Sequence, residues 1–206
     1  MKDKKIPEAT ISRLCIYLRE LSELAKNNII TISSSELGER ININDAQIRR
    51  DLGYFGQFGV TGSGYNIIEL KAALKKILGK DRVLNVVVVG AGHLGTALMS
   101  YPRFKQPGLN IVAAFDTSKE KIGRQISNID ILDIKELTRE IKRRKVAMGI
   151  IAVPTENAQE VVDTIVEAGV NCILNFAPAA LNVPENVNLK SVDLCQEIET
   201  LSYFCI

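Results

Sequence analysis

A run of four valines passes directly into closely spaced glycines between residues 86 and 95. The order is Val86-Val87-Val88-Val89-Gly90-Ala91-Gly92-His93-Leu94-Gly95, which is typical of a buried strand followed by a Gly-x-Gly-x-x-Gly turn. In such a turn Gly90 allows a tight bend, Gly92 lets the backbone approach a pyrophosphate, and Gly95 lets the next helix pack on the strand. The pattern predicts a dinucleotide site contacted by residues Gly90, Ala91, Gly92, His93, Leu94 and Gly95.

An acidic residue ends the next apolar segment. Asn110 to Phe115 has the composition of a second strand, and Asp116 follows it. Asp116 lies about 20 residues past Gly95, where this motif places an acid on the ribose hydroxyls. A carboxylate there favours NAD(H) over NADP(H), because it repels a 2′-phosphate. Without the upstream glycines, Asp116 would be interpreted as an ordinary solvated turn residue.

A second set of candidate residues lies on a short helix expected from Asp45 to Phe55. Asn44 is the expected N-cap, and Gln47 resembles the second half of a capping box. An apolar stripe is formed by Ile48, Leu52 and Phe55, and it leaves the opposite side to residues Gln47, Arg49, Arg50, Gly53 and Tyr54. Arginine can bond guanine and glutamine can bond adenine in the major groove. Adjacent arginines on an exposed helix can also simply be solvated.

The elements around that helix indicate which interpretation to prefer. The expected order is a helix over 9–25, a short helix over 35–41, a turn at 42–44, the helix over 45–55, a glycine-rich β-hairpin over 56–65 and a helix over 68–78. This is the order of a winged helix-turn-helix, whose second helix enters the major groove. The segment Gly79-Lys80-Asp81 is the expected hinge to the glycine-turn part.

After Asp116 the hydrophobic pattern alternates between helices and strands. Helices are expected over 135–144 and 156–168, strands over 146–153 and 171–176, a last strand near Val192, and a terminal helix over 195–204. Such alternation predicts an α/β domain with a doubly wound, Rossmann-like parallel sheet.

Composition narrows the class further. The chain has 206 residues, is 46% hydrophobic and carries a formal net charge of +2. Residues 1–80 hold 13 Lys and Arg against 9 Asp and Glu, whereas residues 81–206 hold 13 against 15. The excess of positive charge in the first part agrees with an anionic partner or with a solvated surface. The sequence shows no apolar run of membrane length and no signal peptide, so a cytoplasmic protein is expected.

The cysteines and the histidine suggest neither a metal site nor thiol chemistry. Cys15, Cys172, Cys195 and Cys205 show no Cys-x-x-Cys spacing, and His93 is the single histidine. We therefore expect no bound metal ion and no chemical role for the cysteine thiols.

Several blocks of sequence, spread over nearly the whole chain, form a pattern that is more specific than the glycine motif alone. The blocks are Gln47-Ile48-Arg49-Arg50-Asp51-Leu52-Gly53-Tyr54-Phe55-Gly56, Phe58-Gly59, Gly64-Tyr65, Gly90 to Gly95, Phe115-Asp116, Asn175-Phe176-Ala177-Pro178 and Ser191-Val192-Asp193-Leu194. In these blocks the chain resembles Rex, a bacterial family of redox-sensing transcriptional repressors. The resemblance implies a homodimer that binds double-stranded operator DNA when NADH is low and is released when NADH binds. No covalent chemistry, catalytic residue or membrane partner is implied.

The resemblance also implies a division of labour along the chain. Residues 1–79 would form the winged-helix DNA-binding domain, residues 80–193 the Rossmann NAD(H)-binding domain, and residues 194–206 a C-terminal helix that swaps between subunits. Tyr101 would lie near the nicotinamide, and Arg19 would pair with Asp193. Further cofactor contacts are expected from Pro154, Asn175, Phe176 and Ala177. DNA contacts are expected from Ser34, Gln47, Arg49, Arg50, Tyr54, Thr61, Ser63 and Tyr65.

The chain departs from the family pattern at three places. Val60-Thr61 replaces basic residues that often occur in the wing, and Gly53 replaces a common serine on the recognition helix. We expect weaker or more salt-sensitive operator binding from these changes. Leu194 replaces an aromatic residue near the cofactor, which affects the shape of the nicotinamide pocket.

Two other classes of function were weighed. An NAD-dependent oxidoreductase shares the Rossmann domain, but His93 lies in the glycine turn and about 30 residues remain after Phe176, too few for a substrate domain. Lysine or tyrosine could still act as an acid. A nucleotide- or coenzyme-A-binding module without DNA contact would require the N-terminal helices to serve dimerisation alone.

Overall fold

The computed structural model describes residues 6–59, 63–102 and 108–205. The chain divides into two compact units, an N-terminal unit of residues 1–82 and a C-terminal unit of residues 83–206. The boundary follows the segment 79–81 that the sequence suggested as a hinge. Residues 194–206, expected to act as a separate element, belong to the C-terminal unit in this division. Within the described ranges, the structure contains no helix with the length and apolar character needed to cross a membrane.

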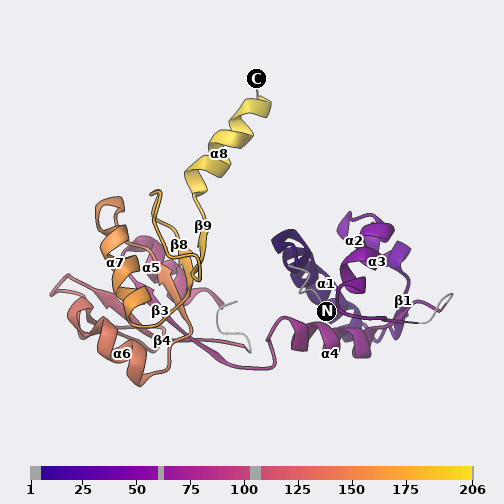
Figure 1. Ribbon diagram of the computed structural model, residues 1–206, viewed down its shortest axis with the longest axis horizontal. Coiled ribbons are helices and arrows are strands. Elements are labelled where there is room, and N and C mark those ends of the chain that lie inside the picture. The colour runs from indigo at the N-terminus through magenta and orange to yellow at the C-terminus, as the bar shows by residue number, and fades with distance from the viewer. Residues whose placement is uncertain (1–5, 60–62, 103–107, 206) are drawn as a thin grey trace. The chain divides into compact units, whose positions relative to one another are not determined.

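The N-terminal unit consists of helices around a small core (Figure 1). Its elements are α1 (Glu8–Lys26), β1 (Thr31–Ile32), α2 (Ser34–Ile41), α3 (Asp45–Gly53), β2 (Tyr65–Asn66) and α4 (Ile67–Ile77). Helix α1 buries one face because Leu14, Leu18 and Leu21 recur at helical spacing. On α3, Ile48 and Leu52 enter the same core. The predicted apolar stripe is therefore the packed side of α3.

Two details of the N-terminal unit differ from expectation. The capping box lies at the start of α2, where the Ser33 hydroxyl accepts from the Glu36 amide and the Glu36 carboxylate accepts from the Ser33 amide. Asn44 caps α3 as predicted, by accepting from the Ala46 amide at 2.8 Å. Gln47 does not complete that cap, since its side chain is bonded to Asp51 instead.

The expected hairpin over 56–65 also has a different partner. Its described end, β2, pairs antiparallel with β1, so that Tyr65 lies opposite Ile32. The strand that precedes α2 supplies the pairing, which a local hairpin pattern could not indicate. Residues 60–62, with the departures Val60 and Thr61, lie outside the described residues.

The C-terminal unit is a seven-stranded sheet in the order β5-β6-β4-β3-β7-β8-β9. All neighbouring pairs are parallel except β5 with β6. The strands are β3 (Leu84–Val89), β4 (Leu109–Asp116), β5 (Gln125–Ile126), β6 (Ile129–Asp133), β7 (Met148–Ile151), β8 (Cys172–Asn175) and β9 (Asn188–Ser191). The helical elements are α5 (His93–Ser100), η2 (Ile134–Glu136), α6 (Leu137–Arg143), α7 (Thr155–Glu167), α8 (Leu194–Ser202) and η3 (Tyr203–Cys205). The predicted doubly wound architecture is confirmed, and β5 and β6 are strands that the sequence analysis missed.

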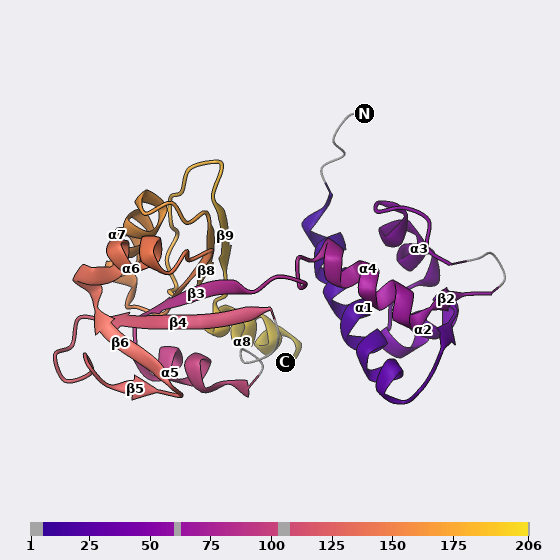
Figure 2. The same cartoon turned by 90° about the horizontal axis from the view of Figure 1, so that it is seen from below.

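Alternate residues of β3 serve the two faces of this sheet. Val87 and Val89 pack in the cluster that contains residues of α6 and α7. Val86 and Val88 pack in a second cluster with Met99 of α5. Figure 2 shows α6 and α7 on one side of β3 and β4, with α5 on the other. Burial on both faces requires an apolar side chain at each of the four positions from Val86 to Val89.

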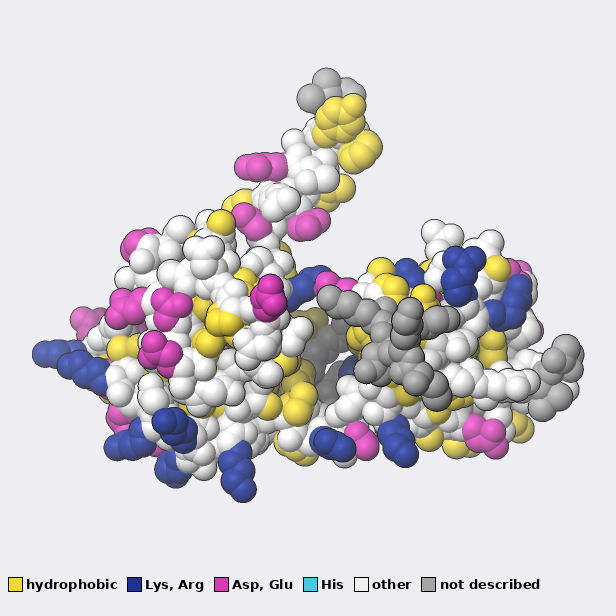
Figure 3. Space-filling view, in the orientation of Figure 1, with side chains coloured by type: hydrophobic (Ala, Val, Ile, Leu, Met, Phe, Trp, Pro, Cys, Tyr) yellow, Lys and Arg dark blue, Asp and Glu magenta, His cyan; other side chains and the backbone are white. Residues whose placement is uncertain are grey.

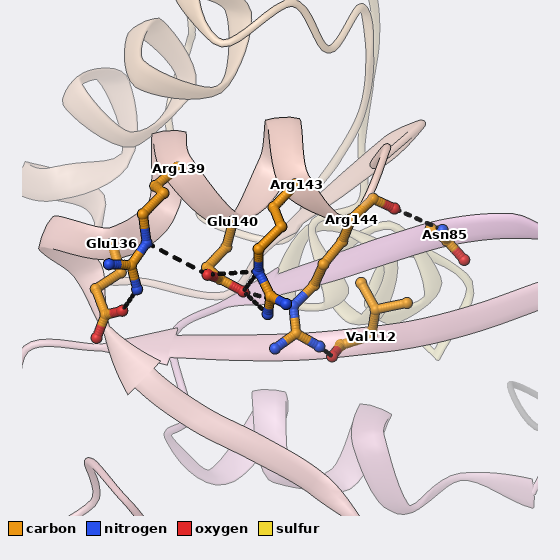
Figure 4. Close-up of polar contacts among 7 residues, drawn as sticks. All are labelled: Asn85, Val112, Glu136, Arg139, Glu140, Arg143 and Arg144. Atoms are coloured by element: carbon orange, nitrogen blue, oxygen red, sulfur yellow. Dashed lines mark hydrogen bonds and ion pairs between the residues drawn. The ribbon is translucent and has the colours of Figure 1, made fainter.

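A buried carboxylate fastens α6 to the sheet (Figure 4). Glu140 is 3% exposed and accepts from Arg143 and Arg144, and these hydrogen bonds lower its pKa to about 2. Arg144 donates onward to the Val112 carbonyl of β4 at 2.5 Å, while Asn85 of β3 donates to the Arg144 carbonyl at 2.6 Å. The network fixes the end of α6 against the two central strands.

Helix α8 contributes no buried residue to its own chain. Its exposed apolar side chains, some visible in Figure 3, are Leu194, Ile198 and Leu201, followed by Tyr203 and Phe204 of η3. Asp193 caps the helix by accepting from the amides of Cys195 and Gln196. An apolar face of this extent is typical of a surface that another chain covers.

Candidate functional site

The glycine turn connects β3 to α5 in a form that only glycine permits at two positions. Gly90 has a φ of 98°, and a Cβ there would overlap the Ala152 carbonyl. A Cβ on Gly95 would overlap the Gly90 carbonyl, because α5 packs directly on the turn. At Gly92 a Cβ would have no heavy atom within 4 Å, so the backbone there faces open space.

The start of α5 is open to an anion. Among the described residues, no side chain caps the helix at Gly92. The amides of a first helical turn have no acceptor within their own helix, and the helix dipole favours negative charge at this end. The backbone around Gly92, His93 and Leu94 therefore fits a phosphate group.

Asp116 lies at the carboxyl end of β4 and bonds to the glycine turn. Its Oδ2 accepts from the Ala91 amide and from the Lys121 ammonium, both at 2.9 Å, and its Oδ1 accepts from the Ser118 amide at 2.8 Å. Burial by itself would raise the pKa of Asp116, but the hydrogen bonds from Ser118, Lys121 and Ala91 together lower it. The group is a carboxylate at neutral pH and is well placed to accept from hydroxyls.

A cavity of about 400 Å³ opens beside this carboxylate, within the usual range for small-molecule sites. Part of its wall is apolar and is formed by Ile134, Leu137 and Val161. An apolar wall suits the flat aromatic ring of a nucleotide base. Of the predicted cofactor residues, Gly90, Gly92, Asp116 and Pro154 line the cavity. Sequence reasoning missed the lining residues Thr117, Lys121, Ile134, Leu137, Val153, Asn157, Glu160, Val161 and Thr164. Thr117, Ile134 and Val153 follow strand ends, which could have pointed to them, whereas Leu137 and the residues of α7 lie in helices.

The other predicted cofactor residues are not among those that line this cavity. Asn175 is fully buried at the end of β8, where its amide donates to the Ala177 carbonyl and the Ser191 hydroxyl and its oxygen accepts from the Ala177 amide. It therefore shapes the loop through its side chain. Phe176 is half-buried under the α5 side of the sheet, and Tyr101 ends α5 with 48% of its surface exposed.

Helix α3, the predicted recognition helix, presents Arg49 and Arg50 to solvent, as the sequence predicts. Figure 3 shows Lys and Arg side chains over α2 and α3. Arg49 is exposed and contacts the Ser34 hydroxyl at 2.7 Å and Asp45 at 2.6 Å. Arg50 is also exposed and lies 3.4 Å from the Gln47 side-chain oxygen. Exposed pairs of this kind cost little to break, so both arginines can turn to another partner.

The remaining candidate DNA contacts differ in their surroundings. Ser34, Arg49 and Tyr65 line one groove of about 540 Å³ in the N-terminal unit. Tyr65 is only 8% exposed and belongs to the core, so it supports this groove from beneath. Tyr54 and Ser63 are exposed. Thr61 lies outside the described residues.

A buried charge on α3 was missed by the sequence analysis. Asp51 is fully buried and accepts from Thr10, Arg13 and Tyr17 of α1 and from Gln47 of α3. Burial would raise the pKa of Asp51, but these hydrogen bonds, with that from Arg13 the strongest, lower it to about 2. A visible signal existed, because Asp51 falls inside the apolar stripe, three residues after Ile48. Gln47 is consequently half-buried and partly committed to Asp51.

Together these features define a protein that joins a helix-turn-helix unit to a dinucleotide-binding fold. The model of a "putative DNA-binding protein N-terminus" matches residues 5–53, and that of a "CoA binding domain" matches residues 81–179. The chain is 47% identical over 203 residues to the redox-sensing transcriptional repressor Rex of Desulforamulus reducens, covering 98% of this chain and 97% of that one. The Rex protein of Carboxydothermus hydrogenoformans is also 47% identical and covers 98% of each chain.

Solved structures agree with the sequence comparison. RSP, a Rex-family repressor, was crystallised with β-NAD⁺ and operator DNA; it is 40% identical and superposes with a TM-score of 0.94 over 98% of this chain and 94% of that one. Its complex with β-NADH is 38% identical, with a TM-score of 0.88 over 98% and 95% of the two chains. The chain belongs to the Rex family of redox-sensing transcriptional repressors. Members of this family are repressors and not enzymes.

Proposed function

We propose that this chain binds operator DNA as a cytoplasmic homodimer and leaves it when NADH binds, so that transcription follows the NADH/NAD⁺ ratio. The observation that carries the proposal is its similarity, over 98% of its length, to a repressor solved with NAD⁺ and operator DNA and also with NADH. The open helix start beside Gly92 and the exposed arginines of α3 give each ligand a matching surface.

DNA recognition is assigned to the N-terminal domain, residues 1–79. Helix α3 would enter the major groove with Arg49 and Arg50, while Ser34 and Ser63 would contact the sugar-phosphate backbone of the DNA. Gln47 keeps one amide hydrogen for a base, because its other hydrogen is donated to Asp51, and its oxygen accepts only a long hydrogen bond of 3.4 Å from Arg50. It is therefore an oriented contact rather than a freely turning one.

Cofactor binding is assigned to residues 80–193. The adenine would occupy the apolar cavity, the ribose would bond to Asp116, and the pyrophosphate would lie on the first turn of α5. Tyr101 would lie beside the nicotinamide. Asn175 would hold the Phe176 and Ala177 segment in place through its three hydrogen bonds. The bound cofactor supplies binding energy only, since a repressor needs no hydride transfer.

Dimer formation is assigned to residues 194–206. The apolar face of α8 would be buried against the partner subunit, and Arg19 would pair with Asp193. Asp193 already uses one oxygen to cap α8, which orients its carboxylate. Two recognition helices must reach half-sites about 34–36 Å apart or a multiple of that distance, so a modest rearrangement of the dimer is enough to release DNA.

A competition titration tests this function. An operator duplex selected from a random-sequence library is bound to the protein, and NADH, NAD⁺ or coenzyme A is then added. We expect release by NADH at concentrations where NAD⁺ and coenzyme A leave the complex intact. Equal release by all three, or none by NADH, would contradict the proposal, and NADH consumption would indicate an enzyme.

A further inference from the structure

We propose that Lys121 is a specificity-determining residue of the nucleotide site, which offsets the charge of Asp116 and so reduces the discrimination against NADPH. The inference rests on the proposed NADH site. An acid at the end of the second strand is expected to repel a 2′-phosphate. The structure places a cation directly on that acid.

The first support is the number of hydrogen bonds that Asp116 already accepts. A carboxylate has about four lone-pair positions. Three are used, by the Ala91 amide, the Lys121 ammonium and the Ser118 amide. Because a ribose offers two hydroxyls, bidentate binding requires that one present donor leaves. The two backbone amides are fixed by the glycine turn and the turn after β4, so Lys121 is the donor that can move.

The second support is the position of Lys121 in the cavity. Its side chain is 40% exposed, whereas that of Asp116 is 10% exposed. Both residues line the cavity, together with Thr117 between them in the sequence. A displaced Lys121 therefore stays at the rim of the ribose subsite, on a flexible side chain that reaches Asp116.

The third support is the local charge balance. The ionisable residues of the cavity wall are Asp116, Lys121 and Glu160. Lys121 offsets the charge of Asp116 at the place where the ribose would bind. The third ionisable residue, Glu160, belongs to a different element of the wall, helix α7. A 2′-phosphate would thus meet an ammonium as well as a carboxylate. Charge-assisted hydrogen bonds of this type change affinity by about tenfold or more.

The experiment compares NADH with NADPH on the full-length protein. Dissociation constants are measured by calorimetry for the wild type, Lys121→Gln, Lys121→Arg and the control Lys119→Gln, which removes an exposed charge from the same turn. We expect the ratio of the NADPH to the NADH dissociation constant to rise about tenfold in Lys121→Gln, as one charge-assisted hydrogen bond predicts. It should stay near the wild-type value in Lys121→Arg and Lys119→Gln.

Each other outcome overturns the inference. An unchanged ratio in Lys121→Gln, with NADH still bound and operator DNA still released, refutes the role of Lys121 and leaves the proposed function intact. An equal change in Lys119→Gln would mean that general surface charge sets the preference. Failure of the wild type to bind either nucleotide would refute both proposals. The same ratio measured with adenosine 2′,5′-bisphosphate against AMP places the effect at the 2′-phosphate.

Discussion

Arg13 and Asp51 form a bidentate ion pair that joins α1 to α3, the proposed recognition helix. The Arg13 Nε lies 2.6 Å from Oδ2 of Asp51, and Nη2 lies 2.8 Å from Oδ1. Asp51 is fully buried and Arg13 is mostly covered. Because Arg49 and Arg50 leave α3 on its solvent side, the pair holds the helix from the opposite side and determines how they are presented.

Replacing Asp51 with Asn should destabilise the N-terminal unit and weaken operator binding. Removal of one partner from a buried pair leaves Arg13 without its counter-charge, at a cost of about 3 kcal/mol in the free energy of unfolding. Urea unfolding measures that cost, and NADH affinity should be unchanged. Glu23→Gln, which breaks an exposed pair with Lys26 on α1, should cost less than about 1 kcal/mol. Equal costs for the two variants would show that the buried pair is unimportant.

Asp51 also predicts a dependence of stability on pH. Its pKa in the folded protein is about 2, below its ordinary value of 3.8. A carboxyl group whose pKa is lowered by folding stabilises the folded state at pH values above its ordinary pKa. That contribution is lost as the pH falls from about 4 towards 2. The difference corresponds to about 2 kcal/mol. The free energy of unfolding, measured at several pH values between about 4 and 2, should depend less on pH in Asp51→Asn than in the wild type. The same pH dependence in both proteins would contradict this assignment.

Periodicity indicated most of the fold, because the apolar faces of α1, α3 and β3 are visible in the sequence. The glycine turn could also be predicted from the sequence. Carbonyl oxygens next to Gly90 and Gly95 leave no room for a side chain, so the turn requires glycine at both positions. Strand β5, at the edge of the sheet, and β6, between β5 and β4, were missed because β5 has only two residues and Asp130 and Asp133 interrupt the apolar residues of β6. The hairpin partner was missed because β1 comes from a distant segment.

The sites could be predicted only in part. Helical spacing predicted the exposure of Arg49 and Arg50, and the glycine motif predicted an acid at the end of β4, where Asp116 bonds to the glycine turn. The partners of Asp51 and Asp116 depend on tertiary contacts, such as that between Arg13 and Asp51, which are 38 residues apart. Asn175 was expected inside a strand over 171–176 and is the last residue of β8, and its inward orientation depends on the position of Ser191 in the neighbouring strand.

Alanine at Arg49 or at Arg50 should weaken operator binding without changing NADH affinity. A lost base contact costs about 1–3 kcal/mol, whereas a lost phosphate contact lowers the salt dependence by about one unit. Fluorescence anisotropy at several salt concentrations separates the two cases. Lys75→Ala, an exposed change on α4, serves as the control. Wild-type affinity in both arginine variants would exclude α3 as the recognition helix.

Placing a charge on the apolar face of α8 should convert the dimer into a monomer. Ile198 is 67% exposed in the single chain, and Ile198→Asp would bury a carboxylate in the proposed interface, at a high cost in free energy. Sedimentation should show the monomer, and operator affinity should fall because only one half-site is held. Glu199→Ala, on the same helix, should remain dimeric. A dimeric Ile198→Asp protein would place the interface elsewhere.

The central claim is that NADH and operator DNA bind to the same protein and that each weakens the binding of the other. Linkage requires that the factor by which NADH weakens DNA binding equals the factor by which DNA weakens NADH binding. The most direct measurement is the NADH dissociation constant with and without saturating operator duplex. We expect NADH to bind more weakly to the DNA complex, by the same factor that the competition titration gives for DNA. Equal NADH affinities, with DNA shown to be bound throughout, would contradict the sensor mechanism.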